Sequence, residues 1–179
     1  MSDKIYDATK KYCGAIAVSW YEPFVDALRV IEQCHIRGIK VNIHYLLHRE
    51  NIRAAANLLR SRADWLDQVN AVIFLNYKPI HSQQSLCLED NEDLDAFLSA
   101  VHEHKGYKLG FDSCMVSYLV KFDDSLSYET LEFCEAGRFS AFISEKGLMY
   151  PCSFLHDTDC SGIDLTQSSL EQGWQYGIV

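Results

Sequence analysis

The chain has 179 residues, of which 48% are hydrophobic and 23% charged, so it can bury a sizeable core and is not typical of disordered proteins. Its net charge of −9 argues against a nucleic-acid-binding protein and against docking on anionic membranes. The sequence has no run of about 18 apolar residues and no apolar signal core at the N-terminus, so we expect a cytoplasmic protein without a membrane span.

Up to residue 111, short apolar runs alternate with helical patterns. Strands are predicted at 14–20, 40–47, 69–75 and 107–111, and helices at 22–38, 51–66 and 92–104. This alternation predicts parallel strands with helical crossovers, forming an α/β fold. The near-continuous apolar strands suit a sheet covered on both faces or closed as a barrel. Four strands cannot close an eight-stranded barrel, so a small open sheet and half of a barrel both fit the pattern.

After Asp112 the pattern changes. A short helix is predicted at 113–121, followed by an acidic loop, Asp123–Ser127. Strands at 139–143 and 148–150 predict a β-hairpin, with Gly147 where the turn needs a positive φ. The tail from Asp157 onward is rich in Ser, Thr, Gln and Gly and is predicted to be a polar loop.

Polar residues stand near the C-terminal ends of three predicted strands: Ser19, His44 and Asn76, with Lys78 just beyond the third. In a barrel that end is the functional face, although a polar residue there can also simply meet water or a neighbouring backbone. His44 lies between Ile43 and Tyr45 in an apolar strand, where a histidine must be hydrogen-bonded, ligate something or line a polar cavity.

Seven cysteines in a chain without a signal core indicate metal binding or reactivity rather than disulfides. Four of them have polar neighbours and bracket the predicted hairpin: Cys114, Cys134, Cys152 and Cys160. Four thiolates from separate segments suit a [4Fe–4S] or [2Fe–2S] cluster or a tetrahedral zinc ion. Cysteine also serves as a buried apolar filler, and we predict that role for Cys13, Cys34 and Cys87.

The run from Cys134 to Cys152 has a spacer of twelve residues, then Gly147, then four residues before the second cysteine, which Pro151 precedes. Gly162 and the segment Ser169-Leu-Glu-Gln-Gly-Trp174 follow. These features resemble the auxiliary-cluster region of radical S-adenosylmethionine (radical SAM) enzymes, called the SPASM domain or, in shortened form, the twitch domain. On weaker grounds, the first 110 residues resemble the second half of the family's partial (β/α)6 barrel.

The resemblance implies a half barrel at 1–112 and a cysteine module at 113–179. It implies that Cys114, Cys134, Cys152 and Cys160 ligate an auxiliary [4Fe–4S] cluster, and that Ser19, His44 and Asn76 face S-adenosylmethionine or a substrate. In this family the substrate is often a peptide or a small metabolite.

The family's Cys-x3-Cys-x2-Cys motif, which holds the cluster that cleaves S-adenosylmethionine, is absent from the sequence. We therefore expect a C-terminal fragment that is not catalytically competent alone, with a possible partner supplying the missing half barrel. The alternatives are a zinc-binding interaction module that uses Cys134, Cys152, Cys160 and His156, and a metal-free α/β domain with buried thiols.

Overall fold

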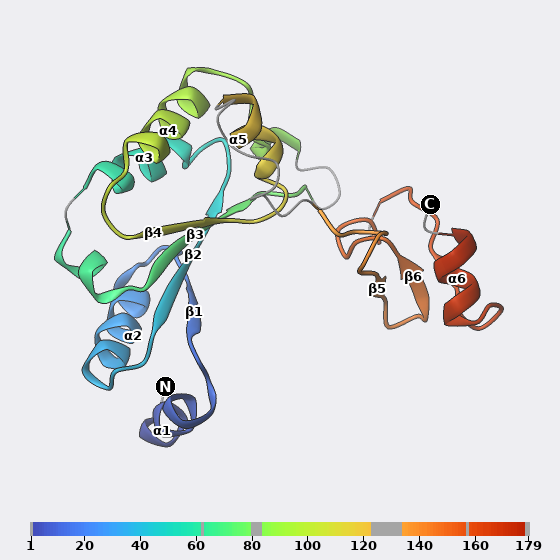
Figure 1. Cartoon of the computed structure of the whole chain (residues 1–179), viewed down its shortest axis with the longest axis horizontal. Helices are drawn as coiled ribbons and strands as arrows, with labels where there is room; N and C mark the ends of the chain where they lie inside the picture. Colours follow the sequence, from blue (N-terminus) through green and yellow to red (C-terminus); the bar gives the residue numbers. More distant parts are fainter. Residues whose placement is uncertain (1, 62, 80–83, 123–133, 157, 178–179) are drawn as a thin grey trace. The chain divides into compact units, whose positions relative to one another are not determined.

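The computed structural model describes residues 2–61, 63–79, 84–122, 134–156 and 158–177 (Figure 1). The chain forms two compact units, Met1–Tyr77 with Leu88–Leu131, and Lys78–Cys87 with Glu132–Val179. The acidic loop predicted at Asp123–Ser127 lies outside the described residues. Across those residues, every helix is too short or too polar to cross a membrane.

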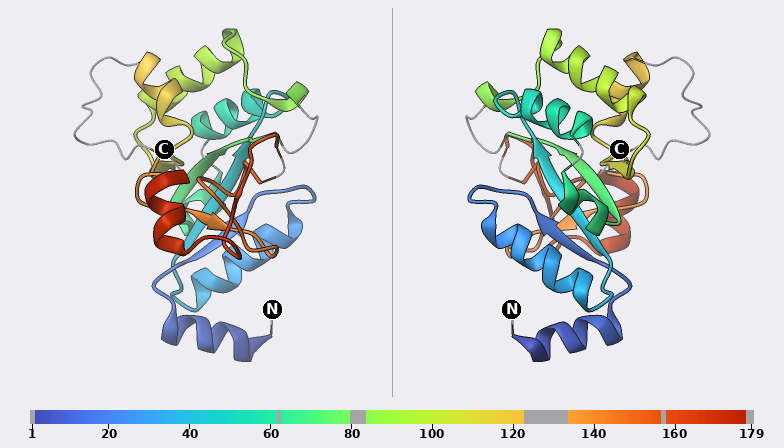
Figure 2. Two further views of the ribbon diagram at one scale, coloured as in Figure 1. Left: turned by 90° about the vertical axis from the view of Figure 1, so that its right-hand side faces the viewer. Right: turned by 90° about the vertical axis from the view of Figure 1, so that its left-hand side faces the viewer.

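The first unit is a parallel four-stranded sheet in the order β1-β2-β3-β4, as the alternating pattern predicts. Its strands are β1 (Ile16–Ser19), β2 (Val41–Leu47), β3 (Ala71–Asn76) and β4 (Lys108–Phe111). Its helices are α1 (Asp3–Tyr12), α2 (Val25–Ile36), α3 (Ile52–Arg60), α4 (Glu92–Glu103) and α5 (Val116–Phe122). Figures 1 and 2 show α2, α3 and α4 packed beside the sheet and α1 at the end where β1 begins.

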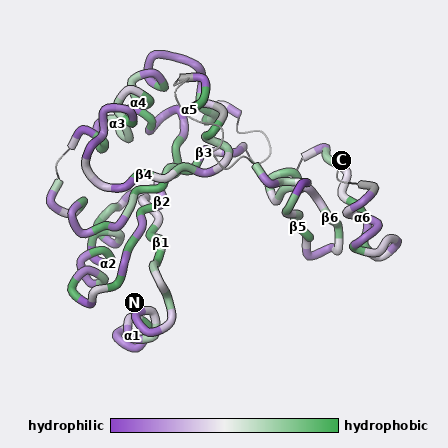
Figure 3. The backbone as a smooth tube through the Cα atoms, in the orientation of Figure 1, coloured by the Kyte–Doolittle hydropathy of each residue, from purple (hydrophilic) through white to green (hydrophobic). Residues whose placement is uncertain are grey.

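The core of the first unit lies between the sheet and its helices. In β2 every second side chain is buried, namely Val41, Ile43, Tyr45 and Leu47, and Val72 and Phe74 of β3 continue this layer. The ring of Phe74 lies 5.0 Å from that of Phe97 on α4, in an edge-to-face arrangement. Figure 3 shows the helices of this unit alternating between hydrophobic and hydrophilic segments, as expected for helices that cover a sheet on one side.

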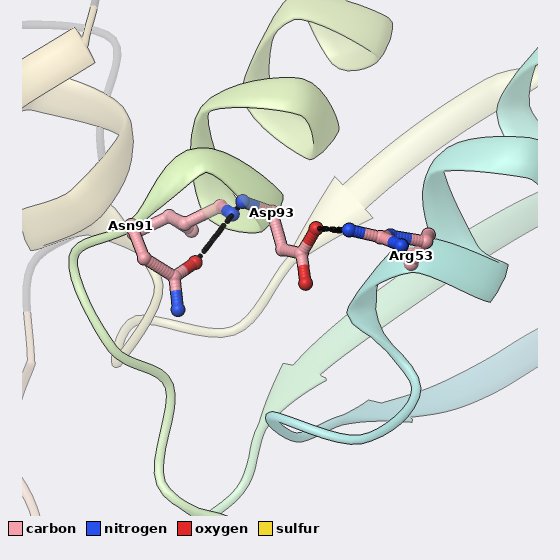
Figure 4. Close-up of polar contacts among 4 residues, drawn as sticks. Arg53, Asn91 and Asp93 are labelled. Carbon is pink, nitrogen blue, oxygen red and sulfur yellow. Dashed lines mark hydrogen bonds and ion pairs between the residues drawn. The ribbon is translucent and has the colours of Figure 1, made fainter.

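Helix α4 is held at its first turn by side chains from two elements. The Asn91 side-chain oxygen accepts hydrogen bonds from the backbone N–H groups of Asp93 (3.0 Å) and Leu94 (3.3 Å), so it caps the helix (Figure 4). Arg53 of α3 donates to the Asp93 carboxylate at 2.6 Å, as Figure 4 also shows. These contacts fix α4 against α3.

Two predicted elements of the first unit differ from the structure. The helix predicted at 51–66 ends at Arg60, because the Ser61 hydroxyl and backbone N–H both donate to Leu58 O; a 3₁₀ helix, η1 (Asp64–Gln68), follows. The strand predicted to be buried at 14–20 forms β1, in which Ala17 and Ser19 are exposed because β1 lies at the edge of the sheet.

The second unit contains a three-stranded antiparallel sheet, β5 (Phe142–Ile143), β6 (Leu148–Tyr150) and β7 (Ile163–Asp164), together with a 3₁₀ turn, η2 (Gln84–Leu86). The predicted hairpin is confirmed, with Gly147 at φ 76° in its turn.

The prediction of a loop-like tail is wrong, since β7 and α6 (Leu170–Gly177) occupy it. The helix begins with a reciprocal cap: Gln172 N–H donates to the Ser169 hydroxyl (3.1 Å), and Ser169 N–H donates to the Gln172 side-chain oxygen (2.9 Å). This Ser-x-x-Gln signal was present in the sequence and could have identified the helix.

Candidate functional site

One face of the first unit's sheet carries the predicted polar residues of β1 and β2. The strand register places Ser19 beside His44, and His44 beside Ile73 of β3. These residues alternate with the buried ones of each strand, so they point to the face opposite the helix-covered core. The structure therefore places Ser19 and His44 side by side on one face of the sheet.

His44 is half-buried, and within the described residues its ring has no hydrogen-bond partner. Asn42, two residues before His44 on β2, does have a partner. The Asn70 side-chain amide donates to the Asn42 side-chain oxygen at 2.8 Å. Imidazole nitrogens need water, a ligand or a protein partner. Of the polar side chains along β2, His44 is thus the one available to bind a small molecule or substrate.

Asn76 lies apart from that pair. It is the last residue of β3 and stands opposite Leu47, whose side chain belongs to the buried layer, so its position alternates away from the His44 face. Its side-chain oxygen is buried and has no hydrogen-bond partner among the described residues. A buried acceptor left unsatisfied is costly, so Asn76 is an exception to the usual pairing of buried polar atoms.

Asp112 is a residue of this region that the sequence reasoning missed. It follows β4 directly, and its carboxylate accepts hydrogen bonds from the backbone N–H groups of Asn76 (3.2 Å) and Met115 (3.1 Å). It thereby ties the C-terminal end of β3 to the turn that begins α5. The available signal was an acidic residue at the end of a strand and before a helix, the same position that singled out Asn76.

The four predicted cluster cysteines fall in both units. Cys114 is half-buried and follows β4 in the first unit, whereas Cys134, Cys152 and Cys160 belong to the second unit. Cys134 is exposed, and the other two are half-buried. Throughout the described residues, no three His, Cys, Asp or Glu side chains lie close enough together to hold one metal ion.

The surroundings of Cys152 fit a thiolate ligand. The backbone N–H of Phe154 donates to the Cys152 sulfur at 3.5 Å, the kind of hydrogen bond that tunes cluster thiolates. The Lys78 ammonium lies 4.8 Å from the centroid of the Phe154 ring, so a cation also stands near this turn. The donor chemistry of the second unit therefore suits a soft metal or an iron–sulfur cluster, although the structure does not bring its cysteines together.

The other three cysteines, which were predicted to be buried apolar fillers, differ in their burial. Cys34 is fully buried, and burial raises the pKa of its thiol more than the nearby Arg37 lowers it, so this cysteine stays protonated in the core. Cys87 is half-buried. The prediction is wrong for Cys13, which is exposed because it lies just past the last residue of α1, where its N–H donates to Thr9 O.

No protein-family model matches the chain, and no curated protein sequence matches it. Solved structures that resemble it are those of Streptococcus suis SuiB: SuiB itself with a TM-score of 0.52, SuiB bound to S-adenosylmethionine with 0.54, and SuiB bound to the precursor peptide SuiA with 0.54. Each is 13% identical to this chain and covers 83% of it, whereas the chain spans only 36–37% of the SuiB chains. At this identity the likeness shows a shared fold and no more.

Proposed function

We propose that the chain forms the C-terminal part of a radical SAM maturase-like oxidoreductase that acts on a peptide, or otherwise on a small metabolite. The observation that carries this proposal is the shared fold, which extends over 83% of the chain in structures of SuiB with S-adenosylmethionine and with a precursor peptide. The cysteine spacing around Gly147 also supports it, because it resembles the family's auxiliary-cluster pattern.

Within this proposal, residues 1–112 are half of a partial barrel whose inner face carries Ser19 and His44. The pair would contact S-adenosylmethionine or substrate through a hydroxyl and an imidazole. Asp112 positions Asn76 through the backbone. When bound, S-adenosylmethionine supplies the radical chemistry; this chain contributes binding and orientation.

Residues 113–179 form the cysteine module of the proposal. Cys134, Cys152 and Cys160, with Cys114, would hold an auxiliary [4Fe–4S] cluster that supplies electron transfer or contacts substrate. The Phe154 N–H would hydrogen-bond one cluster thiolate. Since the sequence has no Cys-x3-Cys-x2-Cys motif, cleavage of S-adenosylmethionine would need the other half of the barrel, from a partner or from a longer parent polypeptide.

Anaerobic reconstitution followed by iron and sulfide analysis tests the cluster directly. We expect about four iron and four sulfide per chain, as in a [4Fe–4S] protein, with broad visible absorption. Cys152→Ala should lose most of both. The matched control is Cys13→Ala, which removes an exposed cysteine outside the proposed ligand set and should keep the full content. Iron and sulfide absent from the reconstituted wild type would refute the cluster.

One observation favours zinc as the second candidate. His156 Nδ1 lies 2.6 Å from Ser153 O, which is the second-nitrogen hydrogen bond that fixes the ring of a zinc-ligating histidine. A structural zinc module would use His156 with Cys134, Cys152 and Cys160 and serve protein interaction. In the same metal analysis it predicts zinc without sulfide, lost on His156→Ala and retained in the Cys13→Ala control.

A further inference from the structure

The four cysteines that the sequence implies as cluster ligands do not all belong to one compact unit. Cys134, Cys152 and Cys160 lie in the second unit, whereas Cys114 lies in the first. The bonds of a protein metal site are set to within about 0.2 Å, so its ligands must be held in fixed positions. A cluster that used Cys114 would therefore have to be shared between two units.

Cys114 is held by the packing of the first unit. It lies between Asp112 and Met115, in a turn where the Met115 N–H donates to the Asp112 backbone oxygen (2.9 Å) and to the Asp112 carboxylate (3.1 Å). Met115 is fully buried in the core of this unit. The position of Cys114 is thus set by elements that carry none of the other three cysteines.

A different cysteine belongs to the second unit with those three. This unit consists of Lys78–Cys87, which is part of the connection between β3 and α4, and of Glu132–Val179. Cys87 follows the 3₁₀ turn η2, where its N–H donates to Gln84 O at 3.0 Å, and it is half-buried. The cysteines of the second unit are therefore four in number, namely Cys87, Cys134, Cys152 and Cys160.

A contact beside Cys152 joins the two segments of this unit. The Lys78 ammonium lies 4.8 Å from the centroid of the Phe154 ring, and the Phe154 N–H donates to the Cys152 sulfur at 3.5 Å. The segment that ends at Cys87 is thus attached, at its other end, to the turn that carries a proposed cluster ligand.

We infer that Cys87, and not Cys114, is the fourth ligand of the metal site, together with Cys134, Cys152 and Cys160. The inference rests on the proposed function, because it assigns a ligand to the cluster of that proposal. It keeps the four-thiolate set that an iron–sulfur cluster uses and draws all of it from one compact unit. Cys87, which the sequence predicted to be an apolar filler, then has a ligand role.

Metal binding would have to bring these four thiols together. Among the described residues, no three possible metal ligands already lie close enough to share one ion. Small metal-dependent domains commonly gather their ligands only when the metal binds. Ligation of Cys87 would then fasten the connection that leaves the C-terminal end of β3 to the hairpin and the tail of the second unit.

Differential alkylation of the reconstituted chain tests this assignment. The chain is treated with iodoacetamide before and after a chelator removes the metal, and each cysteine is quantified by mass spectrometry. We expect Cys87 to react several-fold more slowly while metal is bound, as Cys152 should, because a ligating thiolate is not free to attack the reagent. Cys114 is the matched control, since it is also half-buried and should react equally in both states.

Metal analysis of variants separates ligation from burial, because folding of the unit around a metal also shields a cysteine. Cys87→Ala should lose most of the iron and sulfide that the wild type binds, whereas Cys114→Ala should retain both. The opposite result overturns the inference and leaves the proposed cluster in place, and so does equal alkylation of Cys87 with and without metal. A wild type that binds neither iron nor sulfide refutes the proposed cluster itself. Zinc that Cys87→Ala keeps and His156→Ala loses overturns the inference in favour of the zinc module.

Discussion

The two units are held together by different amounts of apolar burial. The first has one continuous core of 22 buried residues, from Tyr6 to Leu119, and partly buried residues of β1 and β4 pack against it. In the described part of the second unit, the buried hydrophobic residues are Met149 and Tyr150, both on β6. Its strands are two or three residues long. Small units with so little core commonly need a metal or a disulfide, so the proposed metal would have a structural task in the second unit.

Of the changes considered, metal removal should have the largest effect on the difference in stability between the two units. If the cysteine module binds a cluster or zinc, ligation contributes much of the folding energy of the second unit, as in small metal-dependent domains. We expect hydrogen exchange in residues 142–173 to accelerate strongly on chelation, while β2 and β3 keep their protection. The reconstituted Cys13→Ala variant is the control and should respond as the wild type does. Unchanged protection of the second unit without metal would show that its apolar contacts suffice.

The next effect in size concerns the core of the first unit. Phe74 is fully buried, and its ring contacts those of Tyr45 (5.5 Å), Phe97 (5.0 Å) and Phe111 (5.8 Å between centroids). Phe74→Ala should lower the free energy of unfolding by about 3–5 kcal/mol, because it leaves a cavity among these rings. Urea unfolding followed by tryptophan fluorescence measures it, since Trp20 and Trp65 both lie in this unit.

The control for Phe74 is Phe139→Ala, which removes a ring that is 80% exposed in the second unit. It should change the unfolding free energy by about 0.5 kcal/mol or less. Equal losses in the two variants would contradict the contrast between a unit with a packed core and a unit without one.

The success of the sequence predictions follows the same division. β2, β3 and α4 are predicted to within about two residues, because each carries a long apolar repeat that packing on the sheet reinforces. The end of α3 and the tail helix α6 are set instead by local side-chain hydrogen bonds at Ser61 and Ser169, which an apolar repeat does not report. A strand of two residues such as β7 has no repeat to recognise.

The candidate site could be predicted only in part. Adjacency of Ser19 and His44 follows from parallel strands in sequence order, so strand-end reasoning suffices for that pair. The role of Asp112 depends on a hydrogen bond between the ends of β3 and β4, and the displacement of Asn76 depends on the register with Leu47. Register between parallel strands is a property of three-dimensional packing, and spacing along one sequence does not specify it.

Gly162 provides a smaller test, within the second unit. A Cβ atom at this position would lie 2.5 Å from Cζ of Tyr150, so Gly162→Ala must displace one of the few buried rings of this unit. Overpacking of this kind costs on the order of 1–3 kcal/mol. We expect the fluorescence transition of Trp174 to move to lower urea while those of Trp20 and Trp65 stay in place. In Gly14→Ala, where the added Cβ meets nothing within 4 Å, neither transition should move in this way.

The smallest expected effect is the alkaline titration of Tyr107 in the first unit. Its hydroxyl donates to Leu58 O at the end of α3, and burial raises the pKa of this phenol to about 12. In the unfolded chain the group titrates near pH 10. Between about pH 10 and 12 the folded state keeps a proton that the unfolded state has lost, so this contribution to stability is complete below pH 10 and disappears as pH rises toward 12.

Tyr107→Phe should therefore lose less stability than the wild type across that window, which urea midpoints at successive pH values measure. Tyr12→Phe is the matched control, because it removes the same hydroxyl from an exposed tyrosine of the first unit. If the stability of the wild type and that of Tyr107→Phe fell equally as the pH rises, the Tyr107 ring would be accessible to water. In that case the contact between the β4 entry and α3 would open without unfolding, and the packed core of the first unit would end at Leu59 and Leu66, short of Tyr107.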